Sequence, residues 1–92
     1  MIISFKHRGL KRLYEKDDRK GINQEHVRKI VQILAQLHDT NCPEDMDLPS
    51  FKLHALSGNL AKFWSVTVRA NWRIIFRFEG QNVADVELID YH

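Results

Sequence analysis

The 92-residue sequence contains one cysteine, two prolines and no long apolar run. A single cysteine cannot form an internal disulfide, nothing resembles a signal peptide, and no segment is apolar enough to span a membrane. We therefore expect a cytoplasmic protein with no membrane partner. The length fits one domain over residues 1–92, and a domain of this size buries only about 60–65% of its unfolded surface. Nine aromatic residues argue against a disordered chain.

The formal net charge of +2 conceals four alternating blocks of charge. Residues 1–29 sum to +5, residues 39–47 to −4, residues 52–77 to +5 and residues 79–92 to −4. The third block is rich in Phe, Trp, Val and Ile and contains no acid, so one face of the folded core should attract an anion. Basic surface mixed with aromatic side chains is what RNA binding requires. Charge alone leaves open that these bases are ordinary solvated surface.

Apolar spacing predicts two helices in the N-terminal half. Residues 24–38 are predicted to be helical because apolar residues recur there at the spacing of one helical face: Val27, Ile30, Val31, Leu34 and Leu37. Asn23 precedes this helix as its N-cap. A shorter helix is predicted near residues 8–16. Residues 39–50 contain both prolines and four acids, which is typical of a loop with one short turn of helix.

The apolar period becomes two in the C-terminal half, which is typical of strands. Strands are predicted at about residues 2–5, 51–54, 63–68, 72–78 and 84–89, with turns at residues 69–71 and 79–82. The order β-α-α-β-β-β-β predicts an α+β domain. In such a domain the two N-terminal helices pack on one face of an antiparallel sheet.

Alternation along these strands assigns side chains to the two faces of the sheet. The helix-covered face should take the bulky set Trp72, Ile74, Phe76 and Phe78, and the opposite face of that strand Arg73 and Arg77. Lys52 and His54 share a face of the short strand. Asp90 and His92 share a face of the last strand, and the direction of Tyr91 is open because strand ends fray. If the strands adjoin, these groups converge on the face that the helices leave open.

That set of side chains matches the needs of RNA cleavage by internal transesterification. The ribose 2′-hydroxyl must lose a proton, the 5′-oxygen must gain one, and the extra negative charge of the phosphorane must be neutralised. Histidine serves as acid or base near neutral pH, and each positioned acid or base contributes about 10²–10⁴ in rate. Arginine and lysine supply the charge stabilisation.

Four separated motifs resemble the HigB toxins, which belong to the RelE superfamily of bacterial toxin–antitoxin systems. They are Val66-Thr67-Val68-Arg69-Ala70-Asn71-Trp72-Arg73-Ile74-Ile75-Phe76, Phe51-Lys52-Leu53-His54-Ala55-Leu56, Pro43-Glu44-Asp45-Met46 and Asp90-Tyr91-His92. The resemblance covers nearly the whole chain without a large insertion. It implies a microbial-RNase-like, RelE-like α+β fold. It also implies a toxin that cuts messenger RNA in the decoding site of the ribosome, without a cofactor or a metal.

The resemblance also implies a partner and a set of site residues. The partner is a HigA-like helix-turn-helix antitoxin, so that operator DNA is contacted only through the antitoxin. The catalytic positions are His54, Asp90, Tyr91 and His92, and the positions that contact the RNA phosphate are Lys52, Arg69 and Arg73. Many relatives have a lysine where this chain has Ser57, and Lys52 or Lys62 is expected to substitute for it. Which group is the base and which the acid is left open.

Other functions of these residues remain alternatives at this point. His54, Asp90 and His92 are also the ligand set of a two-histidine, one-carboxylate metal site. Cys42 is a weak candidate nucleophile because it precedes a proline in an acidic loop. The same fold could bind RNA or the ribosome without cutting, or cut free RNA without a ribosome. The basic N-terminal helices are compatible with contact to ribosomal RNA, to an acidic antitoxin surface, or to solvent alone.

Overall fold

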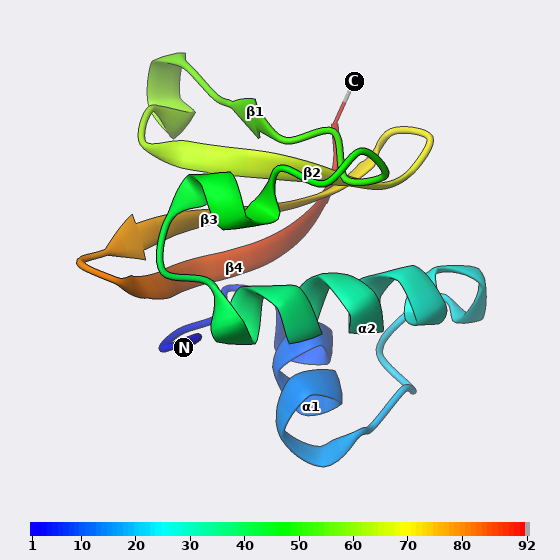
Figure 1. The fold of residues 1–92 in the computed structure, drawn as a ribbon. Helices are drawn as coiled ribbons and strands as arrows, with labels where there is room; N and C mark the ends of the chain where they lie inside the picture. The colour runs from blue at the N-terminus through cyan, green and yellow to red at the C-terminus, as the bar shows by residue number, and fades with distance from the viewer. Residues whose placement is uncertain (92) are drawn as a thin grey trace.

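The computed structural model describes residues 1–91, and it arranges them in two layers (Figure 1). One layer is a four-stranded antiparallel sheet in the order β1-β2-β3-β4. The other layer contains α1 (Arg8–Lys16) and α2 (Gln24–Asp39), which cover one face of the sheet. The predicted α+β class is confirmed, and His92 lies outside the described residues.

Helix α1 has the predicted bounds and is fixed at both ends. The Nδ1 atom of His7 accepts a hydrogen bond from the Leu10 N–H at 3.1 Å, which makes His7 the N-cap. The helix stops at Asp17, whose φ of 53° is left-handed. Gly9 lies against the loop that follows, since a Cβ on Gly9 would sit 2.7 Å from the Gly21 carbonyl oxygen. This close approach requires glycine.

Helix α2 begins at the predicted cap, where the Asn23 side chain accepts from the Glu25 N–H at 2.9 Å. Its buried stripe differs from the prediction at one position. Val31 was expected in the stripe but is 39% exposed, and Ile33 is fully buried instead. The buried stripe is therefore the side of the helix that the sheet covers, and it includes Ile33 in place of the predicted Val31.

The strands form a meander, joined by short connections. Their bounds are β1 (His54–Ala55), β2 (Phe63–Arg69), β3 (Trp72–Glu79) and β4 (Asn82–Asp90), and two single-turn 3₁₀ helices precede β1 and β2 at η1 (Pro43–Met46) and η2 (Gly58–Leu60). The short strand predicted at residues 51–54 is displaced, because Lys52 has a φ of 50° and leaves the extended conformation. Lys52 and His54 therefore do not share the face of a strand.

The strand predicted at residues 2–5 is reduced to two isolated parallel bridges, Ile2 to Val83 and Phe5 to Val86. These bridges attach the N-terminal segment to the outer edge of β4. The Ile3 N–H donates to the Val83 carbonyl at 2.8 Å and the Lys6 N–H to the Val86 carbonyl at 2.8 Å.

Two irregularities change the faces expected from strict alternation. The register of β2 on β3 shifts between Thr67 and Arg69, and that of β3 on β4 shifts between Ile75 and Arg77. The second shift places Asp85 in a bulge with a φ of 54°. Strict alternation is therefore interrupted on β2 after Thr67 and on β4 at Asp85, whereas β3 keeps the predicted alternation from Trp72 to Phe78.

The core lies between the helices and one face of the sheet. Strand residues that enter it include Val66, Val68, Ile74, Phe76, Val83 and Val86. The helices contribute Leu10, Leu13, Val27, Ile30, Ile33, Leu34 and Leu37, and Met46 and Phe51 close one side. We call the sheet face away from the helices the open face. None of the helices among residues 1–91 is long and apolar enough to cross a bilayer.

Candidate functional site

Most of the predicted site residues gather at one end of the sheet, which we call the turn end. It consists of the β2–β3 turn at Ala70 and Asn71, the last residues of β4, and the segment that enters β1. Two backbone hydrogen bonds define it. The Tyr91 N–H donates to the Asn71 carbonyl at 2.8 Å, and the Thr67 N–H donates to the Phe51 carbonyl at 2.7 Å. The chain next to Phe51 therefore lies beside the end of β2, and Lys52 is exposed there.

His54 lies on β1 directly opposite Ser65 of β2, and its side chain is exposed. Across the sheet, Ser65 pairs with Ile75 and Ile75 with Glu87. Directly opposed residues share a face, so His54 and Glu87 begin and end one row of the open face. Ser65 and Ile75 form the floor of this row, with Ile75 only 2% exposed.

Arg73 occupies the neighbouring row of the open face, between Thr67 of β2 and Ile89 of β4. Its guanidinium donates to the carbonyls of Ala70 and Trp72, the latter at 3.2 Å. These bonds turn the Arg73 head group towards the β2–β3 turn. The prediction that Arg73 lies opposite the bulky apolar face is thus consistent with the register.

Arg69 lies on the other side of the sheet from Arg73. The register shift after Thr67 sets Arg69 opposite Trp72, on the helix-covered face. The Arg69 guanidinium contacts the Glu25 carboxylate of α2 at 3.3 Å. The structure therefore does not bring Arg69 and Arg73 together as a pair, although they are only four residues apart.

Asp90 and Tyr91 lie at the end of β4. Asp90 pairs with Trp72 and is exposed, and Tyr91 is 45% exposed. Strands β1 and β4 are opposite edges of the sheet and do not adjoin, so the backbones of His54 and Glu87 are about 14 Å apart across three strand spacings. The predicted convergence on the open face is therefore not found for His54 and Asp90, because they lie on opposite edge strands and Asp90 pairs with Trp72 of the helix-covered face.

The predicted role of His92 lies outside the described residues. Within residues 1–91 no group of three or more His, Cys, Asp or Glu side chains is arranged to hold a metal ion. His54 and Asp90 stand on opposite edge strands, and their sheet faces differ because Asp90 pairs with Trp72.

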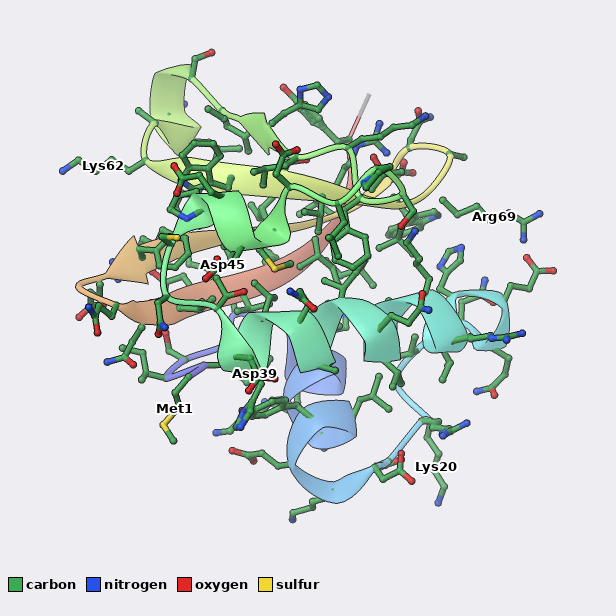
Figure 2. All side chains as sticks on the ribbon, viewed as in Figure 1. Met1, Lys20, Asp39, Asp45, Lys62 and Arg69 are labelled. Carbon is green, nitrogen blue, oxygen red and sulfur yellow. The ribbon has the colours of Figure 1, made fainter. Side chains whose placement is uncertain are left out.

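The two lysines expected to substitute for the lysine missing at Ser57 lie at different ends of the sheet. Figure 2 shows Lys62 and Arg69 at opposite ends of β2. Lys62 therefore lies away from the turn end, whereas Lys52 lies beside it. Ser57 itself immediately precedes η2 and makes no side-chain capping bond there. Of the two lysines, only Lys52 lies beside the turn end.

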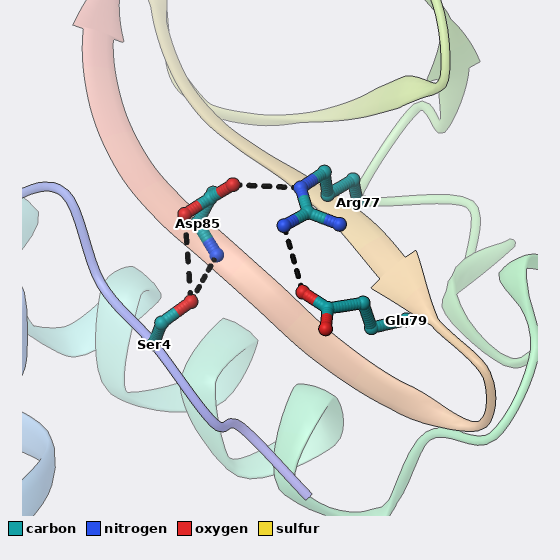
Figure 3. A network of polar contacts seen from close by, with 4 residues as sticks. All are labelled: Ser4, Arg77, Glu79 and Asp85. Atoms are coloured by element: carbon teal, nitrogen blue, oxygen red, sulfur yellow. Dashed lines mark hydrogen bonds and ion pairs between the residues drawn. The ribbon is translucent and has the colours of Figure 1, made fainter.

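The sequence did not predict a polar network that joins β3, β4 and the N-terminal segment (Figure 3). Arg77 Nε donates to Asp85 at 2.6 Å, and Arg77 Nη2 donates to Glu79 at 2.7 Å. The Asp85 N–H in turn donates to Ser4 Oγ at 2.8 Å. Arg77 holds the pKa of the Asp85 carboxyl below its ordinary value, and the two carboxylates raise the pKa of Arg77. Arg77 is thus engaged by acids and is not available as a phosphate ligand.

Cys42, the candidate nucleophile of the sequence analysis, is half-buried beside η1. A hydrogen bond with Glu44 raises the pKa of the Cys42 thiol, and partial burial acts in the same direction. A raised pKa reduces the thiolate fraction at neutral pH, so this thiol lacks the activation that nucleophilic cysteines require.

Comparison with known proteins shows what this chain is similar to. Residues 3–92 match the family model of the HigB-like toxins, described as the RelE-like toxin of the type II toxin–antitoxin system HigB. The endoribonuclease HigB of Proteus vulgaris is 39% identical over 92 residues, which are all of this chain and all of that protein. Among solved structures, the YoeB dimer of Staphylococcus aureus matches with a TM-score of 0.62 and 17% identity, covering 100% of this chain and 97% of that one. At that identity the likeness shows the fold alone.

Proposed function

Because the chain belongs to the HigB-like toxins of type II toxin–antitoxin systems, we propose that it is an endoribonuclease that cuts messenger RNA on the ribosome. The 39% identity to an endoribonuclease, without a gap in coverage at either end, supports the activity. The observation that carries the proposal is the turn end of the sheet. There, Lys52, Arg73, Asp90 and Tyr91 lie around one exposed rim, with His54 on the open face beside it.

The proposed reaction is an internal transesterification. The ribose 2′-oxygen bonds to the adjacent phosphorus as its proton is removed, and the bond from phosphorus to the 5′-oxygen breaks as that oxygen takes a proton. The products are a 2′,3′-cyclic phosphate and a 5′-hydroxyl. Asp90 or His92 removes the 2′-proton, and His54 or Tyr91 helps protonate the leaving oxygen. Arg73 and Lys52 neutralise the charge that develops on the phosphate.

Arg69 has a separate place in this proposal because it faces α2. Its side chain is 65% exposed and its contact with Glu25 is a surface ion pair, which contributes little to stability. Arg69 can therefore leave Glu25 to contact RNA outside the scissile phosphate. We assign it a contact with flanking RNA, which affects binding more than the chemical step.

The spacing of the site supports the proposed dependence on the ribosome. His54 lies on one edge strand and Asp90 and Tyr91 on the other, with about 14 Å between the strand backbones. A flexible RNA would have to be ordered across this span before the acid and the base could both act. Substrate positioning is worth several kcal/mol of the barrier, and the decoding site supplies it by holding the codon in a fixed path.

The proposal includes the partner that the family implies. A type II toxin has a protein antitoxin, and we propose that it is a HigA-like helix-turn-helix protein. The antitoxin would make the contacts to operator DNA, and the toxin would act in the cytoplasm without a cofactor. A growth assay in which the antitoxin is co-expressed reports this partnership directly.

The test is a brief induction in a bacterial host, followed by mapping of new 5′ ends on a translated message and on its start-codon mutant. Cuts confined to the translated message support ribosome-dependent cleavage. Growth arrest without new ends would favour a binding module that does not cut, and cuts in both messages would favour a free ribonuclease. His54→Ala should abolish the cuts, whereas His38→Ala, on the exposed side of α2, should leave them unchanged.

A further inference from the structure

Trp72 lies between two residues of the proposed site. On the helix-covered face it pairs with Arg69 on one side and with Asp90 on the other. Directly opposed side chains in an antiparallel pair have Cβ atoms about 4.5–5.5 Å apart, which brings them into contact. Trp72 is therefore the cross-strand neighbour of Asp90. Its indole is 36% exposed, so a large apolar side chain reaches the surface at the turn end.

The indole of Trp72 is backed by a histidine of α2. The ring centroids of His26 and Trp72 are 5.7 Å apart with an angle of 54° between the planes. His26 is only 6% exposed and lies in the first turn of the helix. The His26 N–H also donates to the Asn23 carbonyl at 2.9 Å, which fixes the backbone of His26 at the capped end of α2. The capped end of α2 thus contacts the ring of Trp72 through His26.

The end of β4 depends on β3 for its position. Along the outer edge of β4, the pairing described within residues 1–91 ends at Val86, where Lys6 is bonded. Beyond that point the register of β4 is set by β3, through the Trp72–Asp90 pair and the bond from Tyr91 to Asn71. The N-terminal segment therefore does not support Asp90 and Tyr91, the two described residues to which the proposal assigns proton transfer.

From these contacts we propose that Trp72 is a positioning residue for Asp90 and Tyr91, and that His26 holds Trp72 in place. This inference rests on the proposed function, because positioning has a catalytic meaning only if Asp90 and Tyr91 act on RNA. The contact path runs from α2 through His26 and Trp72 to the end of β4. A displacement of about 1 Å at a reacting group can reduce a rate by as much as 10², so a loosened strand end is costly.

The kinetic test uses ribosomes programmed with a short message. Trp72→Ala should lower the maximal cleavage rate about tenfold, with the half-saturating toxin concentration changed by less than about twofold. Trp72→Phe keeps a ring on His26 and should restore most of the rate. His26→Ala should show a smaller loss of the same kind, and His26→Phe should be close to the parent chain. Trp64→Phe is the matched control, since Trp64 pairs with Ala55 and Phe76, away from Asp90.

A second readout does not depend on activity. Amide hydrogen exchange of the Tyr91 N–H should be at least about fivefold faster in Trp72→Ala and in His26→Ala, because the end of β4 is less restrained. The Ile3 N–H, bonded to Val83 at the far end of β4, should exchange at the parent rate. A general loss of stability would accelerate both amides, so the comparison separates local loosening from partial unfolding.

Three outcomes would overturn the inference. A raised half-saturating concentration with an unchanged maximal rate would mean that Trp72 touches the RNA itself. Parent-like exchange at Tyr91 in folded Trp72→Ala would mean that the ring does not restrain β4. Equal rates for Trp72→Ala and Trp72→Phe would mean that the ring contact with His26 is irrelevant. If the parent chain itself does not cut RNA, the proposed function fails, and the exchange experiment still decides whether Trp72 positions the strand end.

Discussion

Arg77 and Asp85 form an ion pair at 2.6 Å that depends on a bulge in β4. Asp85 adopts a φ of 54° at the point where the register of β4 on β3 shifts. The Asp85 N–H, displaced from the ladder, is satisfied by Ser4 Oγ. The bulge thus places the Asp85 carboxylate where it accepts hydrogen bonds from Ser4 of the N-terminal segment and from Arg77 of β3. It also removes Arg77 from the group of bases that face an anion.

We expect this pair to make stability sensitive to acid. Arg77 lowers the pKa of Asp85 below its ordinary 3.8. A lowered carboxyl pKa stabilises the fold fully above the pKa of the unfolded chain, and that contribution is lost as the pH falls through the lower pKa of the folded state. Asp85→Asn should therefore lower Tm by a few degrees at pH 7 and by less near pH 3, because the contribution of Asp85 is partly lost below the pKa of the unfolded chain. Asp47→Asn, an exposed carboxylate outside the network, should show no such pH dependence.

Gly9→Ala should destabilise the fold by about 1–3 kcal/mol, because the added methyl group meets the Gly21 carbonyl oxygen at 2.7 Å and the His7 ring at 2.9 Å. Alanine is the better helix former, so an exposed site would give the opposite sign. Urea unfolding measures the change. Lys11→Ala, on the exposed side of the same helix, is the control and should change the free energy of unfolding by less than about 0.5 kcal/mol. A neutral or stabilising Gly9→Ala would contradict the close approach of α1 and the loop.

The separation of Arg69 from Arg73 predicts unequal effects on cleavage. Arg73→Gln should reduce the maximal rate about a hundredfold, because it removes a cation from the scissile phosphate. Arg69→Gln should change the maximal rate by less than about threefold and act mainly on the half-saturating concentration, since Arg69 faces Glu25. Rates on programmed ribosomes measure both. Equal losses of maximal rate would show that the register shift after Thr67 does not divide their roles.

The thiol of Cys42 should be slow to alkylate at neutral pH, because its hydrogen bond with Glu44 raises its pKa. Glu44→Gln removes the charge that opposes thiolate formation and should accelerate reaction with iodoacetamide a few fold. Mass spectrometry of the intact chain follows the modification. Glu15→Gln, on α1, should react at the parent rate, and a similar acceleration in that variant would point to a general loosening of the fold instead.

The sequence predicted the elements better than their faces. The bounds of α1 follow from its apolar spacing, and those of α2 from its spacing and the Asn23 cap. A bulge inserts a residue without changing composition, so nothing in the order of residues marked Val68 or Asp85 as a point where alternation fails. The positive φ of Lys52 could not be predicted from the sequence either, since lysine rarely adopts this conformation.

The residues of the candidate site could be proposed from the sequence as a set, and their arrangement could not. His54, Asp90 and Tyr91 could be selected by their chemistry and by resemblance. Their separation depends on the order of strands, which places β1 and β4 at opposite edges. The Trp72–His26 contact depends on how α2 lies on the sheet, and a histidine inside a helix gives no signal that it packs beneath a tryptophan.

The bond between Ser4 and Asp85 joins positions 81 residues apart, and this has a consequence for how the chain is made. The meander of β1 to β4 folds through local hairpins, whereas the N-terminal segment has no partner in the sheet until β4 is present. At a synthesis rate of about 5–20 residues per second, several seconds pass between the synthesis of the N-terminal segment and that of β4. A nascent chain that lacks β4 also lacks Asp90 and Tyr91. Closure of the fold at Ser4 and completion of the proposed site at Asp90 and Tyr91 therefore depend on the same strand, β4.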